Sequence, residues 1–532
     1  MRTTPAVRTA ALAATAVLLP LAACSGPGSG TDPGRPRTAP ASNAPGAANA
    51  GFLAAQKPQW KPCGAPADSQ GGGTSPSPLP GGALWECASM RVPLDYAKRD
   101  GDTIELALVR AKAANPRKRI GSLVFNFGGP GASGVATLPA FGTDYDALRT
   151  RYDLVSFDPR GVGRSKGVKC MSDKQLDAHF EQDATPDDPA EEKAVAQDMK
   201  AYVAACERHS GTELPYVGTE NAARDLDLLR QVLGDDKLNY FGISYGTELG
   251  GVYAHLFPKK VGRAVLDAVV DPTEDSEQSS LAQARGFQLA LDNFTEDCAH
   301  RGDSCKLPGS SGKEVEAWIA DLLGKLEERP VPGLEARRLT QTQATTGIAS
   351  ALYSKESWPL LEQGLDEADG GNGALLLTLA DSLNGRSEDG RYDNSQAANT
   401  AINCADSKQR FTLEQTRAKL PEFRKASPLF GDYLGWGLMS CTGWPVAGAW
   451  DTPDVSAPGA APILVIGNTG DPATPYKGAK AMADELGKGV GVEMTYKGEG
   501  HGAYNSGNAC VQKAVGRYLL DGDVPVAGTV CR

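Results

Sequence analysis

The chain is short of positive charge. Its 54 Lys and Arg residues are outnumbered by 65 Asp and Glu residues, so the formal net charge is −11. This balance gives no general attraction to phosphate backbones or to anionic lipid surfaces, which argues against a nucleic-acid-binding protein.

Long hydrophobic runs are also scarce beyond the N-terminus. Hydrophobic residues make up 41% and charged residues 22% of the 532 residues, a composition typical of soluble globular proteins. It argues against both a multi-span membrane protein and a largely disordered chain. The length is sufficient for one large catalytic domain with an insertion or a second domain.

The first 50 residues are predicted to serve export. Two arginines precede an apolar stretch, residues 10–19, which has the length of a signal-peptide core and is too short to span a membrane. The stretch ends in Leu21-Ala-Ala-Cys24, which resembles the bacterial lipobox. We therefore expect a signal peptide over 1–23 with a lipid on Cys24, and the alternative is an ordinary signal peptide with an incidental cysteine. Residues 24–50, rich in Gly, Pro, Ser and Ala, are predicted to form a flexible tether, so the protein is expected outside the cell, either secreted or as a cell-surface lipoprotein.

Eleven cysteines are an odd number. Removing Cys24 leaves ten, an even number that suits an oxidising compartment. These ten form neighbouring couples along the chain: Cys63 and Cys87, Cys170 and Cys206, Cys298 and Cys305, Cys404 and Cys441, and Cys510 and Cys531. Proximity in sequence does not determine connectivity. Metal binding is the other interpretation, for example by Cys206 with His209, but no compact four-ligand cluster is present, so we expect disulfides and no metal.

From about residue 52 onward, short apolar runs alternate with amphipathic segments, which predicts an α/β fold with a mostly parallel sheet. Buried strands are expected at 122–127, 154–157, 238–241, 265–270 and 463–466. The strand rhythm breaks between about 272 and 462, where segments such as 314–326 look helical. We therefore predict one core, built from 51–271 and 462–532, and a helical cap insertion over 272–461.

The strongest single motif is Gly242-Ile-Ser-Tyr-Gly246, a G-x-S-x-G sequence. It follows a predicted strand and opens a predicted helix, the context in which a serine is exposed on a sharp turn. A serine hydroxyl is a poor nucleophile unless an imidazole removes its proton and an acid orients that imidazole. Ser244 therefore predicts a histidine and an acid elsewhere.

Histidine is rare, with five in the whole chain. The expected chain order is serine, acid, histidine, and His300 and His501 come late enough to follow. His300 lies in a small cysteine-bounded loop and is predicted to be a surface residue. His501 follows the last predicted strand, 492–496, and is the expected base.

Asp471 is the expected acid, because it directly follows a predicted strand and precedes His501. Its Asp-Pro pair could also simply start a turn. Taken with the order along the chain, the predicted catalytic triad is Ser244, Asp471 and His501.

An oxyanion hole is expected from two backbone N–H groups. One is that of Tyr245, and the other should come from the loop Asn126-Phe-Gly-Gly-Pro-Gly131, with Gly129 preferred and Gly128 as the alternative. This glycine run lacks the Gly-Lys-Ser/Thr ending of a phosphate-binding loop, so no nucleotide and no other cofactor is expected.

Together these motifs resemble the prolyl-iminopeptidase-like branch of the α/β-hydrolases, and most closely the secreted tripeptidyl aminopeptidases of actinomycetes. The resemblance covers the chain from about residue 85 to the end. It rests on five ordered motifs: 126–131, 158–165, 242–247, 470–475 and 500–502. Phe127 replaces the histidine of the iminopeptidases, and Glu248 stands where an aromatic residue is expected. The segment 158–165 is interpreted as a structural loop.

The resemblance implies an α/β-hydrolase fold with a helical cap, and release of short N-terminal peptides, typically tripeptides, through an acyl-enzyme. The implied partner is a peptide with a free N-terminus. We expect contact with a membrane only through the lipid anchor, and we expect a monomer. Such an enzyme must hold an ammonium group, for which buried carboxylates are suited. Asp406, in a stretch that resembles a family motif, is the first choice and Glu248 the second, while a purely structural role is the alternative for each.

Two other functions fit the same sequence. One is a secreted carboxylesterase or lipase that uses the same triad. The other is a non-catalytic cell-surface binding protein that has kept the fold, against which the presence of Ser244, Asp471 and His501 argues.

Overall fold

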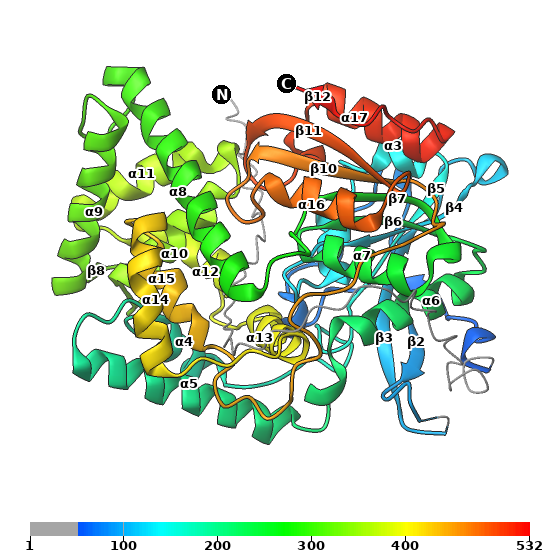
Figure 1. Ribbon diagram of the computed structural model, residues 1–532, viewed down its shortest axis with the longest axis horizontal. Coiled ribbons are helices and arrows are strands. Elements are labelled where there is room, and N and C mark those ends of the chain that lie inside the picture. The colour runs from blue at the N-terminus through cyan, green and yellow to red at the C-terminus, as the bar shows by residue number, and fades with distance from the viewer. Residues whose placement is uncertain (1–51, 99) are drawn as a thin grey trace, which may run out of the picture.

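A mixed β-sheet runs through the larger lobe of the molecule (Figure 1). The computed structural model describes residues 52–98 and 100–532, so the predicted signal peptide, the tether and Cys24 lie outside the described residues. Within that part, ten strands form one sheet, and a smaller lobe of helices lies beside it.

The sheet is parallel over most of its width. Its strands, in spatial order, are β1 (Lys61–Pro62), β2 (Glu86–Pro93), β3 (Thr103–Ala111), β5 (Tyr152–Phe157), β4 (Gly121–Asn126), β6 (Leu238–Ile243), β7 (Val261–Asp267), β10 (Ile463–Gly470), β11 (Gly491–Glu499) and β12 (Thr529–Cys531). β1, β2 and β3 pair antiparallel, and β3 also runs antiparallel to β5. The pairs from β5 to β12 are parallel. Every residue of β4 is buried, as expected of a central strand that is covered on both faces.

Each predicted strand overlaps an observed one, although residues 268–270 of the segment 265–270 lie beyond the end of β7, and one unpredicted strand lies at the end of the chain. The segment 492–496 falls in β11, which is not the last strand, because β12 pairs with it in parallel. β12 has three residues, too few for a hydrophobic period to stand out, and the disulfide from Cys531 to Cys510 ties it to the neighbouring helix. The predicted position of His501 at the end of the final strand is therefore corrected to the end of the strand before it.

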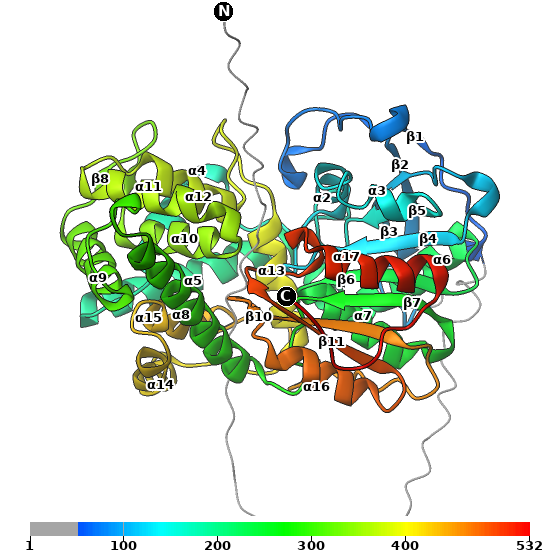
Figure 2. The same cartoon turned by 90° about the horizontal axis from the view of Figure 1, so that it is seen from above.

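Helices cover both faces of the sheet (Figures 1 and 2). One face carries α6 (Thr219–Leu233), α7 (Tyr245–Leu256) and α16 (Lys477–Leu486), and the other carries α2 (Gly134–Ala140), α3 (Asp146–Arg149) and α17 (Ala509–Gly516). Each face has its own apolar core, with Leu226 and Leu249 in one and Phe125 and Phe241 in the other. This is the layered arrangement of an α/β-hydrolase fold.

The smaller lobe has a separate apolar core that includes Phe294, Ile319 and Ile348. Its elements are α8 (Ser276–Arg301), α9 (Gly312–Glu328), β8 (Val331–Pro332), β9 (Arg338–Leu339), α10 (Gln341–Leu352), α11 (Trp358–Asp369), α12 (Ala374–Asn384), α14 (Leu413–Ala426) and α15 (Gly431–Trp436). We call this lobe the cap.

Three helices connect the two lobes. α4 (Asp173–Glu181) and α5 (Pro189–Ser210) precede residue 272 but lie against the cap, where Thr185 Oγ1 donates a hydrogen bond to Gln341 Oε1 at 2.6 Å. Conversely, α13 (Ser395–Asp406) comes after residue 272, yet its Ala398 and Ile402 belong to an apolar core of the sheet. The boundary between the lobes therefore does not follow the order of the sequence.

The disulfide prediction is confirmed. Five bonds in the described part of the chain join the neighbouring couples: Cys63–Cys87, Cys170–Cys206, Cys298–Cys305, Cys404–Cys441 and Cys510–Cys531.

The loop 158–165 acts as a structural brace. The Arg160 guanidinium forms two bonds to the Asp225 carboxylate, at 2.6 and 2.7 Å, and also donates to the carbonyls of Pro93, Leu94 and Tyr216. Both charged side chains are almost fully buried, with exposures of 1% and 0%. The pair therefore ties β2, the β5 loop and α6 together.

Removing Arg160 would leave the buried Asp225 carboxylate without its cation. We expect Arg160→Ala to lower the free energy of unfolding by about 3–5 kcal/mol, measured by urea denaturation with the disulfides intact. The matched control is Arg224→Ala, one residue from Asp225, whose pair with Glu220 is exposed and should contribute less than about 1 kcal/mol. Equal losses for the two variants would contradict this interpretation.

Candidate active site

Ser244 lies on the sharp turn that the motif predicts. β6 ends at Ile243 and α7 begins at Tyr245, and the serine between them has φ 58° and ψ −129°. This conformation is strained for a residue with a side chain and must be held by its surroundings. The Ser244 N–H donates to the carbonyl of Asp267 at 3.1 Å, and Thr247 Oγ1 donates to the Ser244 carbonyl at 2.7 Å.

The turn also needs a glycine at position 246. A Cβ there would lie 2.5 Å from the carbonyl oxygen of Asn126. The carboxyl end of β4 therefore lies directly against the first turn of α7, and the loop that follows β4 is brought to the serine.

Asp471 is presented at the end of β10, as predicted. Its carboxylate is buried and accepts hydrogen bonds from the N–H groups of Ala473 at 3.0 Å and Thr474 at 2.9 Å, and from Gly502 at 3.3 Å. Asp471 Oδ1 lies 2.9 Å from Nδ1 of His501. The predicted acid and base are thus brought together with a fixed orientation.

The cap holds His501 from the other side. The backbone N–H of His501 donates to the carbonyl of Tyr353 at 2.7 Å, and the Tyr353 ring meets the imidazole edge-on, with centroids 5.2 Å apart. Tyr353 follows α10, so a cap residue contacts the imidazole directly. Sequence reasoning missed this residue, because nothing in the local pattern around Tyr353 distinguishes it.

A second carboxylate, which sequence reasoning also missed, supports the histidine loop. Asp267 ends β7 and is buried, and it accepts hydrogen bonds from the N–H groups of Ala503 at 2.9 Å and Tyr504 at 2.8 Å. Burial raises the pKa of Asp267 to about 6, although these N–H groups oppose the shift. Its position at a strand end, in a stretch ending Leu-Asp, is the signal that could have pointed to it.

Opposing effects determine the basicity of His501. Burial alone lowers its pKa, because burial disfavours the imidazolium ion. The charge and hydrogen bond of Asp471, together with the charge of Asp267, outweigh burial and raise the pKa of His501 above its ordinary value of 6.5.

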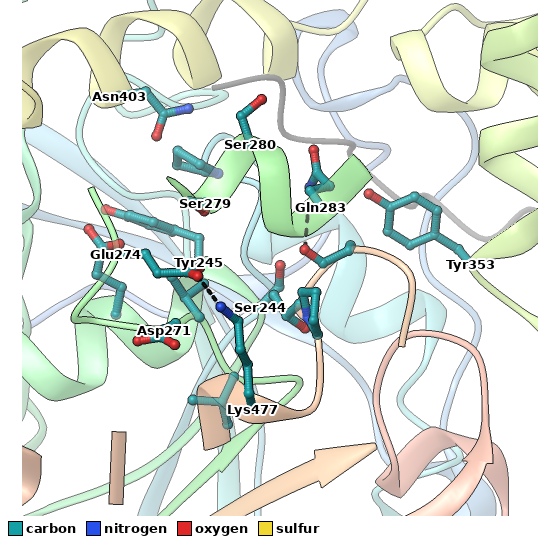
Figure 3. A pocket seen from close by; sticks show the side chains of 17 residues that line it. Ser244, Tyr245, Asp271, Glu274, Ser279, Ser280, Gln283, Tyr353, Asn403 and Lys477 are labelled. Atoms are coloured by element: carbon teal, nitrogen blue, oxygen red, sulfur yellow. Dashed lines mark hydrogen bonds and ion pairs between the residues drawn. The ribbon is translucent and has the colours of Figure 1, made fainter. Parts of the chain in front are cut away.

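Ser244 opens into a pocket between the core and the cap (Figure 3). The core, together with the loop that carries Asp471 (residues 471–476, the acid loop), contributes Pro130, Tyr245, Glu248, Val269, Val270, Asp271, Ala473, Thr474, Pro475 and Lys477. The segment from 274 to 403 contributes Glu274, Ser279, Ser280, Gln283, Tyr353 and Asn403. The cap therefore forms one wall of the pocket and roofs it.

The lining of the pocket is acidic. Among the described residues that form it, the carboxylates are Glu248, Asp271 and Glu274, and Lys477 is the cation. Lys477 pairs with Glu274. Burial, and secondarily the charge of Asp406, raises the pKa of Glu248 to about 8.

Asp406, the first-choice ammonium ligand, lies behind the lining. Its Oδ1 accepts the N–H of Thr219 at 2.8 Å, and its Oδ2 accepts the Thr219 hydroxyl at 2.6 Å. That hydroxyl lies 2.6 Å from the Tyr245 hydroxyl, which separates Asp406 from the pocket. Burial raises the pKa of Asp406 to about 7. Of the two predicted carboxylates, Glu248 is the one that reaches the pocket.

The predicted oxyanion loop lies against the nucleophile. A Cβ on Gly128 would lie 2.7 Å from Ser244 Cβ and 3.1 Å from the backbone nitrogen of Tyr245. The Gly128 N–H donates to Asn126 Oδ1 at 3.0 Å, so it is already engaged. This favours Gly129 over the Gly128 alternative.

The other histidines have structural surroundings. His300 is exposed on α8, His179 contacts Asp198, and the Nδ1 atoms of His209 and His255 lie 2.7 and 2.8 Å from the carbonyls of Cys170 and Ser456.

Within residues 52–98 and 100–532, the group that could gather three ligands around a metal is Asp187, Asp188 and Glu191. It lies at the start of α5, outside the pocket lining. In the same part of the chain, no helix is both long and apolar enough to cross a membrane.

Several known proteins are similar to this chain in sequence. A family model described as TAP-like protein matches residues 427–531, and one described as alpha/beta hydrolase fold matches residues 121–307. The chain is 38% identical to the serine protease Hip1 of Mycobacterium tuberculosis, over 90% of this chain and 91% of that protein. It is 36% identical to carboxylesterase B of the same species, over 84% and 86%, and 31% identical to tripeptidyl aminopeptidase of Streptomyces lividans, over 84% and 83%.

The charge of Asp267 should be measurable in the pH profile of the enzyme. A histidine base must be neutral to act, so kcat/KM should fall with decreasing pH through the pKa of His501, above pH 6.5. Asp267→Asn removes a negative charge that favours the imidazolium but keeps an acceptor for the loop. The acidic limb should therefore move to lower pH, measured with p-nitrophenyl acetate. Asp236→Asn, at a side chain 92% exposed, is the control and should not move it. If the acidic limb of the kcat/KM profile stayed in place or moved to higher pH in Asp267→Asn, Asp267 would not raise the pKa of His501.

Proposed function

The chain belongs to the TAP-like family of α/β hydrolases, and from that premise we propose that it is a serine exopeptidase that releases short N-terminal peptides, above all tripeptides, from peptides with a free N-terminus. The observation that carries the proposal is the acidic, roofed pocket beside Ser244. A free peptide N-terminus carries a positive charge, and acidic groups complement it.

The reaction follows the logic of a serine triad. Ser244 Oγ attacks the scissile carbonyl carbon while His501 Nε2 accepts the hydroxyl proton, and Asp471 holds the Nδ1 side of the ring. The N–H groups of Tyr245 and Gly129 stabilise the oxyanion. Collapse of the intermediate breaks the C–N bond, and His501 gives its proton to the departing amine. Water then attacks the acyl-enzyme in the same way, which releases the short peptide as a carboxylic acid.

Glu248 is the proposed ligand of the substrate ammonium. It lines the pocket one turn beyond the nucleophile, whereas Asp406 acts on it from behind, through charge. With the ammonium bound at a fixed distance from Ser244, the bond that is cut lies a fixed number of residues from the N-terminus. This distance would define the length of the released peptide.

The cap explains why long folded chains would be poor substrates. α8 approaches the acid loop so closely that a Cβ on Gly286 would lie 2.4 Å from the carbonyl oxygen of Pro472, and Gln283 Nε2 donates to the Ala473 carbonyl at 3.3 Å. The roof is thus attached to the loop that carries Asp471. An extended N-terminal segment can enter beneath it more readily than a folded surface can.

The five disulfides support an oxidising, extracellular location. We further propose that Cys24 carries a lipid that attaches the enzyme to the cell surface through the following tether.

A carboxylesterase is the second candidate function. It is supported by the 36% identity to a protein named carboxylesterase B, and a serine triad can cleave esters as well as amides. The substrate preference for a free N-terminus separates the two candidates.

Ser244→Ala should abolish the reaction without affecting the fold. We expect kcat to fall by about 10⁴- to 10⁶-fold, because no other group in the mechanism can form the acyl-enzyme. Activity on Ala-Ala-Pro-p-nitroanilide and circular dichroism would be measured together. Ser387→Ala, a turn serine in the cap, is the control and should keep full activity. Retained activity in Ser244→Ala would mean a different nucleophile.

The preference for free over acetylated Ala-Ala-Pro-p-nitroanilide should peak near pH 8. Below this pH Glu248, with a pKa of about 8, must lose a proton to bind the ammonium, and above it the substrate amine, with a pKa of about 8, must gain one. Taking the ratio of the two kcat/KM values cancels the titration of His501, which affects both substrates.

Glu248→Gln should lower this ratio and remove its rise toward pH 8, while Asp406→Asn should shift its optimum to lower pH, because the charge of Asp406 raises the pKa of Glu248. Mass spectrometry of the products from an unblocked peptide gives the length of the released fragment. Equal rates on free and acetylated substrates in the unaltered enzyme would refute the exopeptidase proposal.

A further inference from the structure

Two asparagines of α13 connect the pocket to the oxyanion loop. Asn403 lines the pocket, and its Nδ2 donates to Asn399 Oδ1 at 3.0 Å. Asn399 Nδ2 in turn donates to the carbonyl of Pro130, at 3.1 Å. Pro130 also lines the pocket and directly follows the predicted oxyanion donor, Gly129.

The Pro130 carbonyl determines which atom of each asparagine donates and which accepts. The Pro130 carbonyl can only accept, so Asn399 must turn its NH₂ toward Pro130 and its oxygen toward Asn403. Asn403 must then turn its own NH₂ toward Asn399. Its carbonyl oxygen is the group left for the pocket, and that oxygen can only accept a hydrogen bond.

α13 and the oxyanion loop also touch through their backbones. A Cβ on Gly131 would lie 2.3 Å from the Ser395 carbonyl oxygen and 3.1 Å from the Asn399 nitrogen. The Asn399 side chain is 4% exposed, so its hydrogen bonds are shielded from water. The helix therefore buttresses residues 128–131 both by packing and by a directed hydrogen bond.

We propose that Asn403 Oδ1 is a binding group for the substrate ammonium, and that Asn399 is a positioning residue that holds the oxyanion loop through the Pro130 carbonyl. This inference rests on the proposed exopeptidase function. In a pocket whose carboxylates outnumber its cations, an acceptor of fixed polarity complements a group with several N–H donors. An ammonium ion has three N–H donors, and the Glu248 carboxylate need not accept all of them. Figure 3 shows Asn403 and Tyr353 on different sides of the pocket around Ser244.

The two roles predict different kinetic effects. Asn403→Ala should raise KM for free Ala-Ala-Pro-p-nitroanilide roughly tenfold or more, the value of a hydrogen bond to a charged group, and should raise KM for the acetylated substrate much less. Asn399→Ala should lower kcat on both substrates, by roughly tenfold or more, because the oxyanion donor is no longer held in place.

Several variants make the test specific. Asn399→Leu keeps the volume of the side chain without its hydrogen bonds and should reproduce the loss of kcat if Asn399→Ala folds poorly. Asn372→Ala removes an exposed cap asparagine outside the pocket and should change neither constant. Thermal unfolding of each variant identifies any loss of fold.

The outcomes separate this inference from the function on which it rests. If the unaltered enzyme does not discriminate free from acetylated substrate, the exopeptidase proposal fails. If it does discriminate, and Glu248→Gln lowers the preference while Asn403→Ala keeps it in full, the assignment of Asn403 alone is overturned. An Asn399→Ala or Asn399→Leu enzyme that folds and retains its kcat would overturn the positioning role.

Discussion

The hydrogen bond between Asp471 and His501 is the contact on which the site depends. The two residues are 30 positions apart and follow different strands, so the 2.9 Å distance requires two loops to be held in register. β10 and β11 pair in parallel, which brings their carboxyl ends to the same edge of the sheet. Three further contacts then fix the loops: the Tyr353 carbonyl on the His501 N–H, the Asp267 carboxylate on the N–H groups beyond it, and the close approach of Gly286 to the acid loop.

These contacts make the cap part of the active site rather than a removable cover. Tyr353 and Gly286 belong to the cap, and both lie against loops that carry proposed catalytic groups. α13 does the same for the oxyanion loop through Asn399. A cap that moved as a rigid lid would break both the Tyr353–His501 and the Gln283–Ala473 hydrogen bonds. Substrate entry is therefore easier to reconcile with local movement of side chains than with opening of the whole lobe.

The sequence predicted what depends on local pattern. The parallel strands, the strained turn at Ser244 and the strand-end positions of Asp471 and His501 all lie in short segments with their own physical signature. β12 was missed because three residues do not display a period. Tyr353 and Asn399 were missed for another reason: each contacts a segment far away in the chain, and a single chain does not reveal which residues meet across a lobe boundary.

The sequence also could not show whether Asp406 or Glu248 is the better candidate for the ammonium ligand. Both are acidic residues near the nucleophile in the fold, and a motif alone does not reveal which side chain faces the pocket. Thr219 favours Glu248 as the proposed ligand, because Thr219 engages both oxygens of Asp406, whereas Glu248 lines the pocket. The spacing of one helical turn between Ser244 and Glu248 then takes on a meaning that a sequence alone could not give it.

The raised pKa of Glu248 also bears on how such a pocket could select a free N-terminus. An ionised carboxylate at this buried position would be costly, but with a pKa of about 8 Glu248 is mostly protonated at pH 7 and adds little charge to the pocket there. Ionising it at pH 7 costs only about 1.4 kcal/mol, one pKa unit, which the attraction of an ammonium a few ångströms away in a partly buried site can exceed. An acetylated N-terminus carries no positive charge, so it does not offer that attraction. Selectivity in this arrangement comes from an ion pair gained on binding, while the roof and the distance to Ser244 decide where the chain is cut.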